Sequence, residues 1–151
     1  MIALACDHAA LGLKKEIMKY LDSLGLEWKD FGTYTTDSCN YPEFGYKAAK
    51  AVASGECDRG IICCGTGVGI SLAANKVKGI RCVVCSDVYS ALLSRQHNDT
   101  NMLSLGARVV GVDLALMIVK AWLDGEYEGG RHQKRLDMIK EIEETGDLKL
   151  D

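Results

Sequence analysis

Short apolar runs alternate with stretches of helical spacing along this chain. The runs predict strands over residues 1–6, 27–31, 59–64, 80–85 and 102–105, of which 80–85 is rich in β-branched residues and 27–31 is the weakest. Apolar residues at three- and four-residue spacing predict helices over 11–24, 41–53, 67–76, 87–96, 113–123 and 131–144. This alternation predicts one α/β domain over residues 1–151. We expect a doubly wound, Rossmann-like, five-stranded parallel sheet with helices on both faces and a C-terminal helix.

Composition narrows the class of protein. The 151 residues are 48% hydrophobic and 26% charged, as in an ordinary globular domain. A net charge of −3 argues against general binding to nucleic acid or to a membrane surface. No apolar run reaches the roughly 18 residues of a membrane span, and the start does not resemble a signal peptide. We therefore expect a cytoplasmic protein.

The seven cysteines favour reduced thiols, because their number is odd and the start shows no export signal. Cys82 and Cys85 have the C-x-x-C spacing of a metal site. They lie in one predicted strand, where residues three apart face opposite ways and cannot easily meet one ion. We predict no metal, and core positions for Cys6, Cys57, Cys63, Cys82 and Cys85.

The most informative segment is the end of the strand over 59–64. Cys64 is its last residue, and the glycine-spaced turn Gly65–Gly69 follows at once and opens a helix. A thiol in that position lies beside backbone N–H groups, which bind anions and favour a thiolate. Sites in such folds lie at the carboxyl ends of strands. Polar residues that follow the other strands should join Cys64 there: Asp7, His8, Thr33, Ser86, Asp87 and Arg108.

A dinucleotide site is the obvious alternative for a glycine-rich loop. The dinucleotide fingerprint needs a third glycine where this chain has Ile70, and the loop follows the third strand instead of the first. No P-loop lysine motif is present. A small anionic substrate fits the short loop better than a dinucleotide.

Three histidines lie at predicted element boundaries, each beside other polar residues: His8, His97 and His132. Structural and catalytic roles both remain open for them. Arg131 and Arg135 are four residues apart and share a helix face. With His132 they form either a phosphate clamp or a solvated basic face.

Three blocks of this sequence together resemble the family of type B ribose-5-phosphate isomerases, which also contains the galactose-6-phosphate isomerase subunits. The blocks are Cys64–Gly69 with Ala73–Lys76, then Ser94–Asn101, then Gly129–His132. The resemblance runs from Asp7 to the last helix. It implies interconversion of an aldose phosphate and its ketose, within the pentose phosphate pathway and without metal or cofactor.

That reaction opens the sugar ring, removes the C2 proton to form an enediolate, and returns a proton to C1. Cys64 is the expected base. Some relatives instead carry a glutamate as base at the position of Ile70, but an isoleucine side chain cannot take a proton, so this sequence supports the thiol as base. The amides of Gly65, Gly67, Val68 and Gly69 would stabilise the enediolate, with the Thr66 hydroxyl nearby. The resemblance implies ring opening by His97, hydroxyl positioning by Asp7 and Asn98, phosphate binding by His8, Arg108, Arg131, His132 and Arg135, and a sugar contact by Tyr41.

Topology predicts that the site is shared between protomers. His97 follows the helix that returns the chain to the amino edge of the sheet, whereas Cys64 lies at the carboxyl edge. A five-residue strand spans roughly 17 Å, too far for an imidazole to cross. We expect a homodimer or a dimer of dimers in which a second subunit supplies His97, and the resemblance also places the site at a dimer interface.

Three alternatives stay open. The substrate within this family could be a six-carbon phosphosugar such as allose or galactose 6-phosphate, since the sequence does not give the length of the pocket. Cys64 and His97 could instead form a nucleophile–base pair for acyl transfer. A non-catalytic module that binds a phosphosugar is the third alternative.

Overall fold

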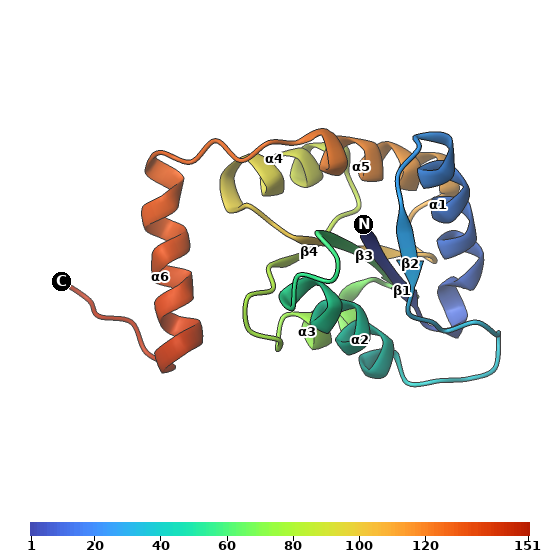
Figure 1. Ribbon diagram of the computed structural model, residues 1–151, viewed down its shortest axis with the longest axis horizontal. Helices are drawn as coiled ribbons and strands as arrows, with labels where there is room; N and C mark the ends of the chain where they lie inside the picture. Colours follow the sequence, from blue (N-terminus) through green and yellow to red (C-terminus); the bar gives the residue numbers. More distant parts are fainter.

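The computed structural model describes residues 1–151 and contains one parallel sheet with the strand order β2-β1-β3-β5-β4 (Figure 1). All four strand pairings are parallel. The strands are β1 (Ile2–Cys6), β2 (Trp28–Asp30), β3 (Arg59–Cys64), β4 (Cys82–Val84) and β5 (Met102–Gly106). The predicted doubly wound α/β sheet is confirmed.

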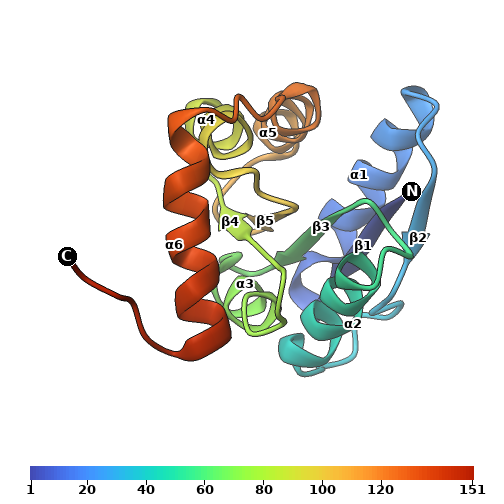
Figure 2. The same cartoon turned by 60° about the vertical axis from the view of Figure 1, so that its left-hand side comes forward.

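Helices cover both faces of this sheet, as Figures 1 and 2 show. They are the one-turn 3₁₀ helix η1 (His8–Ala10), α1 (Leu11–Ser23), α2 (Tyr41–Ala53), α3 (Val68–Ala74), α4 (Val88–Asn98), α5 (Val112–Asp124) and α6 (Arg131–Thr145). Helices α1, α4 and α5 lie on one face, and α2 and α3 lie on the other. Helix α6 stands to one side, beyond β4 (Figure 2).

Each face of the sheet has its own hydrophobic core. Along β3, Ile61 and Cys63 pack against α1 and α5, whereas Ile62 and Cys64 pack against α2 and α3. Successive side chains of a strand point to opposite faces, so a strand that is covered on both sides must be apolar throughout. The adjacent thiols of Cys63 and Cys64 therefore lie in different cores.

Most predicted boundaries shift by one or two residues in the structure, and two further differences change the elements themselves. Strand β4 spans three residues instead of six, because the Ile80 N–H already donates to the Val77 carbonyl in a turn. Between β1 and α1 the one-turn helix η1 intervenes, and Asp7 caps it by accepting the Ala9 N–H at 3.0 Å. The helix η1 includes His8, which the sequence places in the turn after the strand. Helix α4 extends to Asn98, so His97 lies in its last turn and not after the helix as predicted.

Cys6, Cys57, Cys63 and Cys85 are buried in the core as predicted, whereas Cys82 is only partly buried and packs against the core. All seven are free thiols. Cys85 lies in the core beside α5, whereas Cys82 packs against the core on the other face, so the two thiols do not face a common ion. No helix of this chain combines the length and apolar character that crossing a bilayer requires.

Candidate active site

The turn after β3 holds the Cys64 thiol against its own backbone. Cys64 Sγ accepts the N–H of Gly67 at 3.2 Å. Gly67 has a φ of +79°, and a Cβ there would lie 2.9 Å from the Leu105 carbonyl carbon. The positive φ and the lack of space for a Cβ both require glycine at this position. The hydroxyl of Ser104 donates to the Gly67 carbonyl at 2.6 Å, which fixes the turn to β5.

Two other glycines let larger side chains approach the turn. A Cβ at Gly69 would lie 2.5 Å from Tyr41 Cζ, and one at Gly65 would lie 3.3 Å from Arg108 Nη1. The N–H of Arg108 also donates to the Gly65 carbonyl at 3.0 Å. The structure thus brings Tyr41 and Arg108, from α2 and from the end of β5, against the turn that carries Cys64.

Asp7 and His8 complete this group at the end of β1. The Asp7 N–H donates to the Cys63 carbonyl at 3.1 Å, which places the buried Asp7 carboxylate next to the end of β3. His8 Nδ1 accepts the Cys39 N–H at 3.3 Å. In the neutral ring the proton is therefore on Nε2, and that donor is left for another group. We call Asp7, His8, Tyr41, residues 64–69 and Arg108 the carboxyl-edge cluster.

Not every amide of the turn is free to bind an anion. Gly67 donates to Cys64 Sγ, and the Val68 N–H donates to Thr66 Oγ1 at 3.2 Å. Both contacts are made within the turn itself. A substrate oxygen that uses these two amides has to replace the thiol and the hydroxyl as acceptors.

The thiols near the turn differ in their surroundings. Burial raises the pKa of Cys63 well above its ordinary value, and it raises the pKa of Cys6 to about 11 and that of Cys85 to about 12. These three are protonated at neutral pH. Cys64 is also buried, and its sulfur accepts a backbone N–H from the turn.

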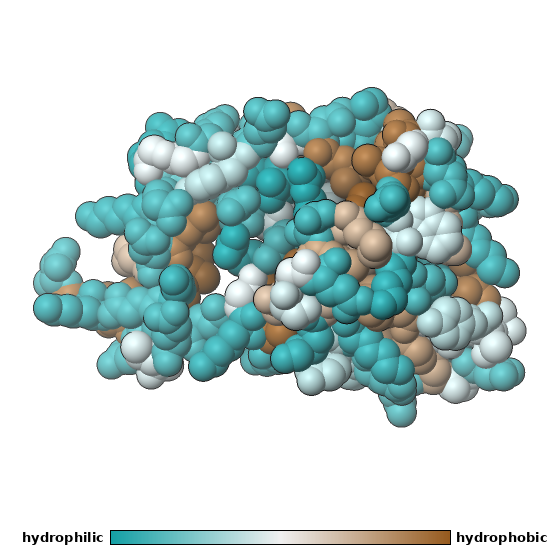
Figure 3. Space-filling view, viewed as in Figure 1, coloured by the Kyte–Doolittle hydropathy of each residue, from teal (hydrophilic) through white to brown (hydrophobic).

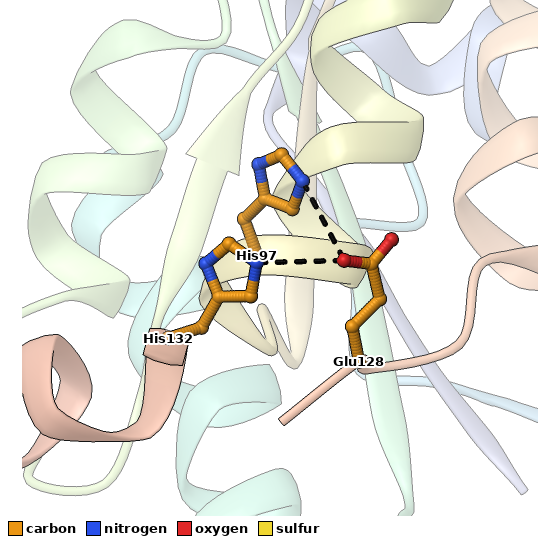
Figure 4. Close-up of side chains that lie close together, drawn as sticks. All are labelled: His97, Glu128 and His132. Atoms are coloured by element: carbon orange, nitrogen blue, oxygen red, sulfur yellow. Dashed lines mark ion pairs between the residues drawn. The ribbon is translucent and has the colours of Figure 1, made fainter. Parts of the chain in front are cut away.

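A second group of predicted site residues gathers where α4 ends and α6 begins. The rings of His97 and His132 stack with their centroids 4.3 Å apart and their planes 15° apart. Figure 4 shows both Nε2 atoms facing one carboxylate oxygen, Oε2 of Glu128, at 3.9 Å from His97 and 3.4 Å from His132. His132 is buried, whereas Glu128 is half-exposed.

The remaining predicted residues surround this stacked pair. Arg131 and Arg135 are exposed on the first turns of α6, and Asn98 is the last residue of α4. We call His97, Asn98, Arg131, His132 and Arg135 the amino-edge cluster. Its charged side chains point away from the two cores and have solvent on at least one side.

The two clusters lie at opposite edges of the sheet. Cys64 pairs with Gly106 at the carboxyl end of β5, whereas Met102, at the amino end, pairs with Gly60. Asn98 precedes Met102 by four residues. Helix α6 remains at this amino edge, because Glu143 near its end accepts the Gly79 N–H just before β4. The structure therefore does not bring His97 and Cys64 of one chain together.

An open groove of about 610 Å³ lies between α6 and β4. Its apolar lining includes Ile80, Val83, Leu136, Ile139 and Ile142, and Asn98 also borders it. Ile139 and Ile142 are each about half exposed. Figure 3 shows this apolar side of α6 facing the hollow between the helix and the rest of the chain.

The sequence reasoning missed three residues that shape these clusters. Lys14 is buried in α1 and donates to Asp30 Oδ1 and to the Thr33 carbonyl, both at 2.6 Å, which fixes the loop after β2. Cys39 orients His8, and Glu128 bridges the two histidines. Glu128 precedes His132 by four residues, a spacing that could have drawn attention to it. The long-range contacts of Lys14 and Cys39 leave no local pattern.

The family model, the similar sequences and the similar solved structures all identify sugar-phosphate isomerases as the relatives of this chain. A family described as Ribose/Galactose Isomerase matches residues 2–139. The chain is 57% identical to ribose-5-phosphate isomerase B of Escherichia coli K12, over 95% of this chain and 96% of that protein. It is 43% identical to D-erythrulose-4-phosphate isomerase of Pectobacterium atrosepticum, over 91% of each chain. The structure of ribose-5-phosphate isomerase B from Clostridium thermocellum superposes with a TM-score of 0.95 at 55% identity, over 97% of this chain and 99% of that one.

Proposed function

This chain belongs to the ribose/galactose isomerase family, a family of aldose–ketose isomerases, and from that premise we propose that it interconverts ribose 5-phosphate and ribulose 5-phosphate. The observation that carries the proposal is the turn after β3, where the thiol of Cys64 meets a backbone N–H beside Tyr41, Asp7 and Arg108. A phosphosugar offers both a carbon acid for that thiolate and anionic groups for the arginines around it. Such a reaction belongs in the pentose phosphate pathway.

Cys64 is the proposed base. In the open-chain aldose its thiolate removes the proton from C2, and electrons move toward the C1 oxygen to give an enediolate. The proton of the C2 hydroxyl then moves to the C1 oxygen. The proton held by Cys64 returns to C1, and the electron pair left on the C2 oxygen forms the carbonyl at C2. The substrate is neither oxidised nor reduced overall, so no cofactor has to supply electrons. We expect amides of the turn and the Thr66 hydroxyl to stabilise the developing negative charge, with a substrate oxygen replacing Cys64 Sγ and Thr66 Oγ1 as the acceptor of the Gly67 and Val68 amides.

Two copies of the chain are needed for the whole reaction. Ring opening is assigned to His97, and the arginines proposed to hold the phosphate include Arg131 and Arg135, all in the amino-edge cluster. That cluster lies a strand length, roughly 17 Å, from Cys64 of its own chain. A homodimer that places the amino-edge cluster of one copy against the carboxyl-edge cluster of the other resolves this separation. The apolar groove beside α6 is surface that such a partner would cover.

The choice of sugar is the finer part of the proposal. The Pectobacterium relative at 43% identity is named for a four-carbon substrate, so this fold accommodates sugars of different length. We favour the five-carbon phosphosugar because the higher identity, 57%, is to a ribose-5-phosphate isomerase. Six-carbon phosphosugars are the other substrates to compare.

The direct test incubates the purified chain with ribose 5-phosphate in the presence of EDTA and follows ribulose 5-phosphate. Parallel reactions contain allose 6-phosphate, galactose 6-phosphate and D-erythrulose 4-phosphate. The proposal expects the largest kcat/KM for ribose 5-phosphate. A larger value for another sugar would reassign the substrate, and binding of all four without turnover would indicate a non-catalytic phosphosugar-binding module. Rapid acylation of Cys64 by an activated ester would instead favour acyl transfer.

A further inference from the structure

The stacked histidines and the glutamate between them form a set of metal donors as well as part of the amino-edge cluster. The ligating atoms of His97, Glu128 and His132 lie within 4.8 Å of one another. Two imidazole nitrogens with one carboxylate oxygen, and a fourth position left to water, are a common donor set for zinc. We propose that this trio, the histidine–glutamate cluster, binds one Zn²⁺ per chain and that the bound ion inhibits the enzyme.

The distances nearly match such a site. Bonds of about 2.0–2.2 Å in tetrahedral geometry place neighbouring ligand atoms roughly 3.4 Å apart. His132 Nε2 is 3.4 Å from Glu128 Oε2, and His97 Nε2 is 3.9 Å from it. These two pairs are within about half an ångström of that spacing, and all three ligand atoms lie within 4.8 Å of one another. Binding of the ion therefore requires His97 to move and the two stacked rings to turn toward a common point.

The cluster combines a rigid part with a mobile part. The His132 side chain is 7% exposed, which fixes the position of one nitrogen. The side chains of His97 and Glu128 are 34% and 51% exposed, so both can rotate to close around an ion that enters from solvent. His132 thus offers a fixed ligand atom, and His97 and Glu128 offer two that can adjust, an arrangement that favours reversible binding of an ion. The sequence predicts no metal, from the spacing of the cysteines and from the family resemblance, so this proposal departs from that expectation at a cluster that contains no cysteine.

The inhibitory consequence rests on the proposed function. If His97 opens the sugar ring, an ion bound through its Nε2 lone pair keeps that nitrogen from accepting or delivering a proton, which ring opening needs. The ion also adds positive charge beside His132, Arg131 and Arg135, where the substrate phosphate is expected. Zinc would hold the phosphosugar by its phosphate while preventing its chemistry, and kcat would fall more than substrate affinity.

Binding can be measured independently of activity. The chain has three histidines, so two-dimensional NMR of their ring nitrogens gives few signals to assign. Titration with Zn²⁺ should shift the ring-nitrogen signals of His97 and His132 until one zinc ion is bound per chain, and it should leave the His8 signals unchanged. In Glu128→Gln the amide oxygen still accepts an N–H but is a weaker ligand, so the zinc Kd should rise at least about tenfold. Glu126→Gln is the matched control, because Glu126 is exposed in the same connector and takes no part in the cluster.

Inhibition is measured on the same three proteins with ribose 5-phosphate. Each protein is compared with its own rate without zinc, because Glu128 contacts His97 and its replacement can change that rate. Zinc should inhibit wild type and Glu126→Gln, and EDTA should restore both. Glu128→Gln should need at least about tenfold more zinc to lose the same fraction of its own zinc-free rate. Equal zinc affinity in wild type and Glu128→Gln would overturn the site. A zinc-dependent shift of the His8 signal that disappears in Cys39→Ser would also overturn it, because it would show that zinc binds to His8 and Cys39 instead. Binding at the cluster without inhibition would overturn the inhibitory role. A chain inactive on every phosphosugar would refute the proposed function, and the NMR titration would still decide the site.

Discussion

The two edges of the sheet are built in different ways. At the carboxyl edge, one continuous segment from β3 into α3 positions the thiol through backbone contacts, and glycines let Tyr41 and Arg108 approach it. At the amino edge, side chains from α4, the connector before α6, and α6 itself meet through ring stacking and one shared carboxylate. The first edge can hold reacting atoms in place within one chain. The second presents charged side chains outward, where the proposed function expects a second copy.

The largest effect should come from removing the proposed base. Cys64→Ala should lower kcat by about 10²- to 10⁴-fold, the usual contribution of a general base. Binding of ribose 5-phosphate, measured by calorimetry, should change little, because the phosphate and hydroxyl contacts lie elsewhere. Alkylation of Cys64 should inactivate the enzyme, and substrate should protect it. Turnover at the wild-type rate in this variant would remove Cys64 from the mechanism.

The neighbouring thiol is the control. Cys63 faces the core on the other side of the sheet, and burial raises its pKa. Cys63→Ala should retain kcat and cost about 1–2 kcal/mol of unfolding free energy through lost packing.

A structural prediction concerns the support of the carboxyl edge. Lys14→Met leaves Asp30 and the Thr33 carbonyl without their buried partner, and we expect a loss of about 3–5 kcal/mol in urea unfolding. Lys47→Met breaks the exposed pair with Glu43 on α2 and should cost less than about 0.5 kcal/mol. Similar losses in the two variants would show that Lys14 does not anchor the loop.

The amino edge should contribute mainly to phosphate binding. Arg135→Ala should raise KM for ribose 5-phosphate about 10- to 100-fold through loss of a charge-assisted contact, with a much smaller effect on unphosphorylated ribose. Lys134→Ala removes a charge from the adjacent exposed position of α6 and should leave both constants unchanged. Equal losses on both sugars in Arg135→Ala would assign Arg135 a structural or catalytic role.

The buried thiols predict a loss of stability at alkaline pH. Burial raises the pKa of Cys6 from 9.0 to about 11. Its contribution to stability is complete below pH 9, and it is lost between pH 9 and 11 as the unfolded chain releases a proton that the folded chain keeps. The slope is about 1.4 kcal/mol per pH unit for each such thiol. Urea unfolding at several pH values from 9 to 11 should show that the free energy of unfolding falls less steeply with pH in Cys6→Ala than in wild type. An unchanged dependence on pH would exclude Cys6 as a cause of the alkaline loss of stability.

The sequence predicted the carboxyl edge better than the amino edge, for a physical reason. Cys64, its glycines and the strand before them are contiguous, so local pattern was enough to place them at the end of a buried strand. The order of the strands in the sheet and the stacking of His97 on His132 depend on contacts between distant segments. Glu128 lay in a stretch that seemed to be only a connector. Topology nevertheless predicted the separation of His97 from Cys64, because a helix after a strand returns the chain to the opposite edge.

The central claim, that two chains complete each site, is tested most directly by subunit exchange between two inactive proteins. Cys64→Ala and His97→Asn are mixed under conditions that exchange subunits, with mass spectrometry to confirm mixed dimers. A two-fold dimer has two sites, and in a mixed dimer one carries both defects while the other is intact. Random exchange makes about half of the dimers mixed, so about a quarter of wild-type activity should return. No recovery, with exchange confirmed, would show that both residues serve the site of one chain and would contradict the account.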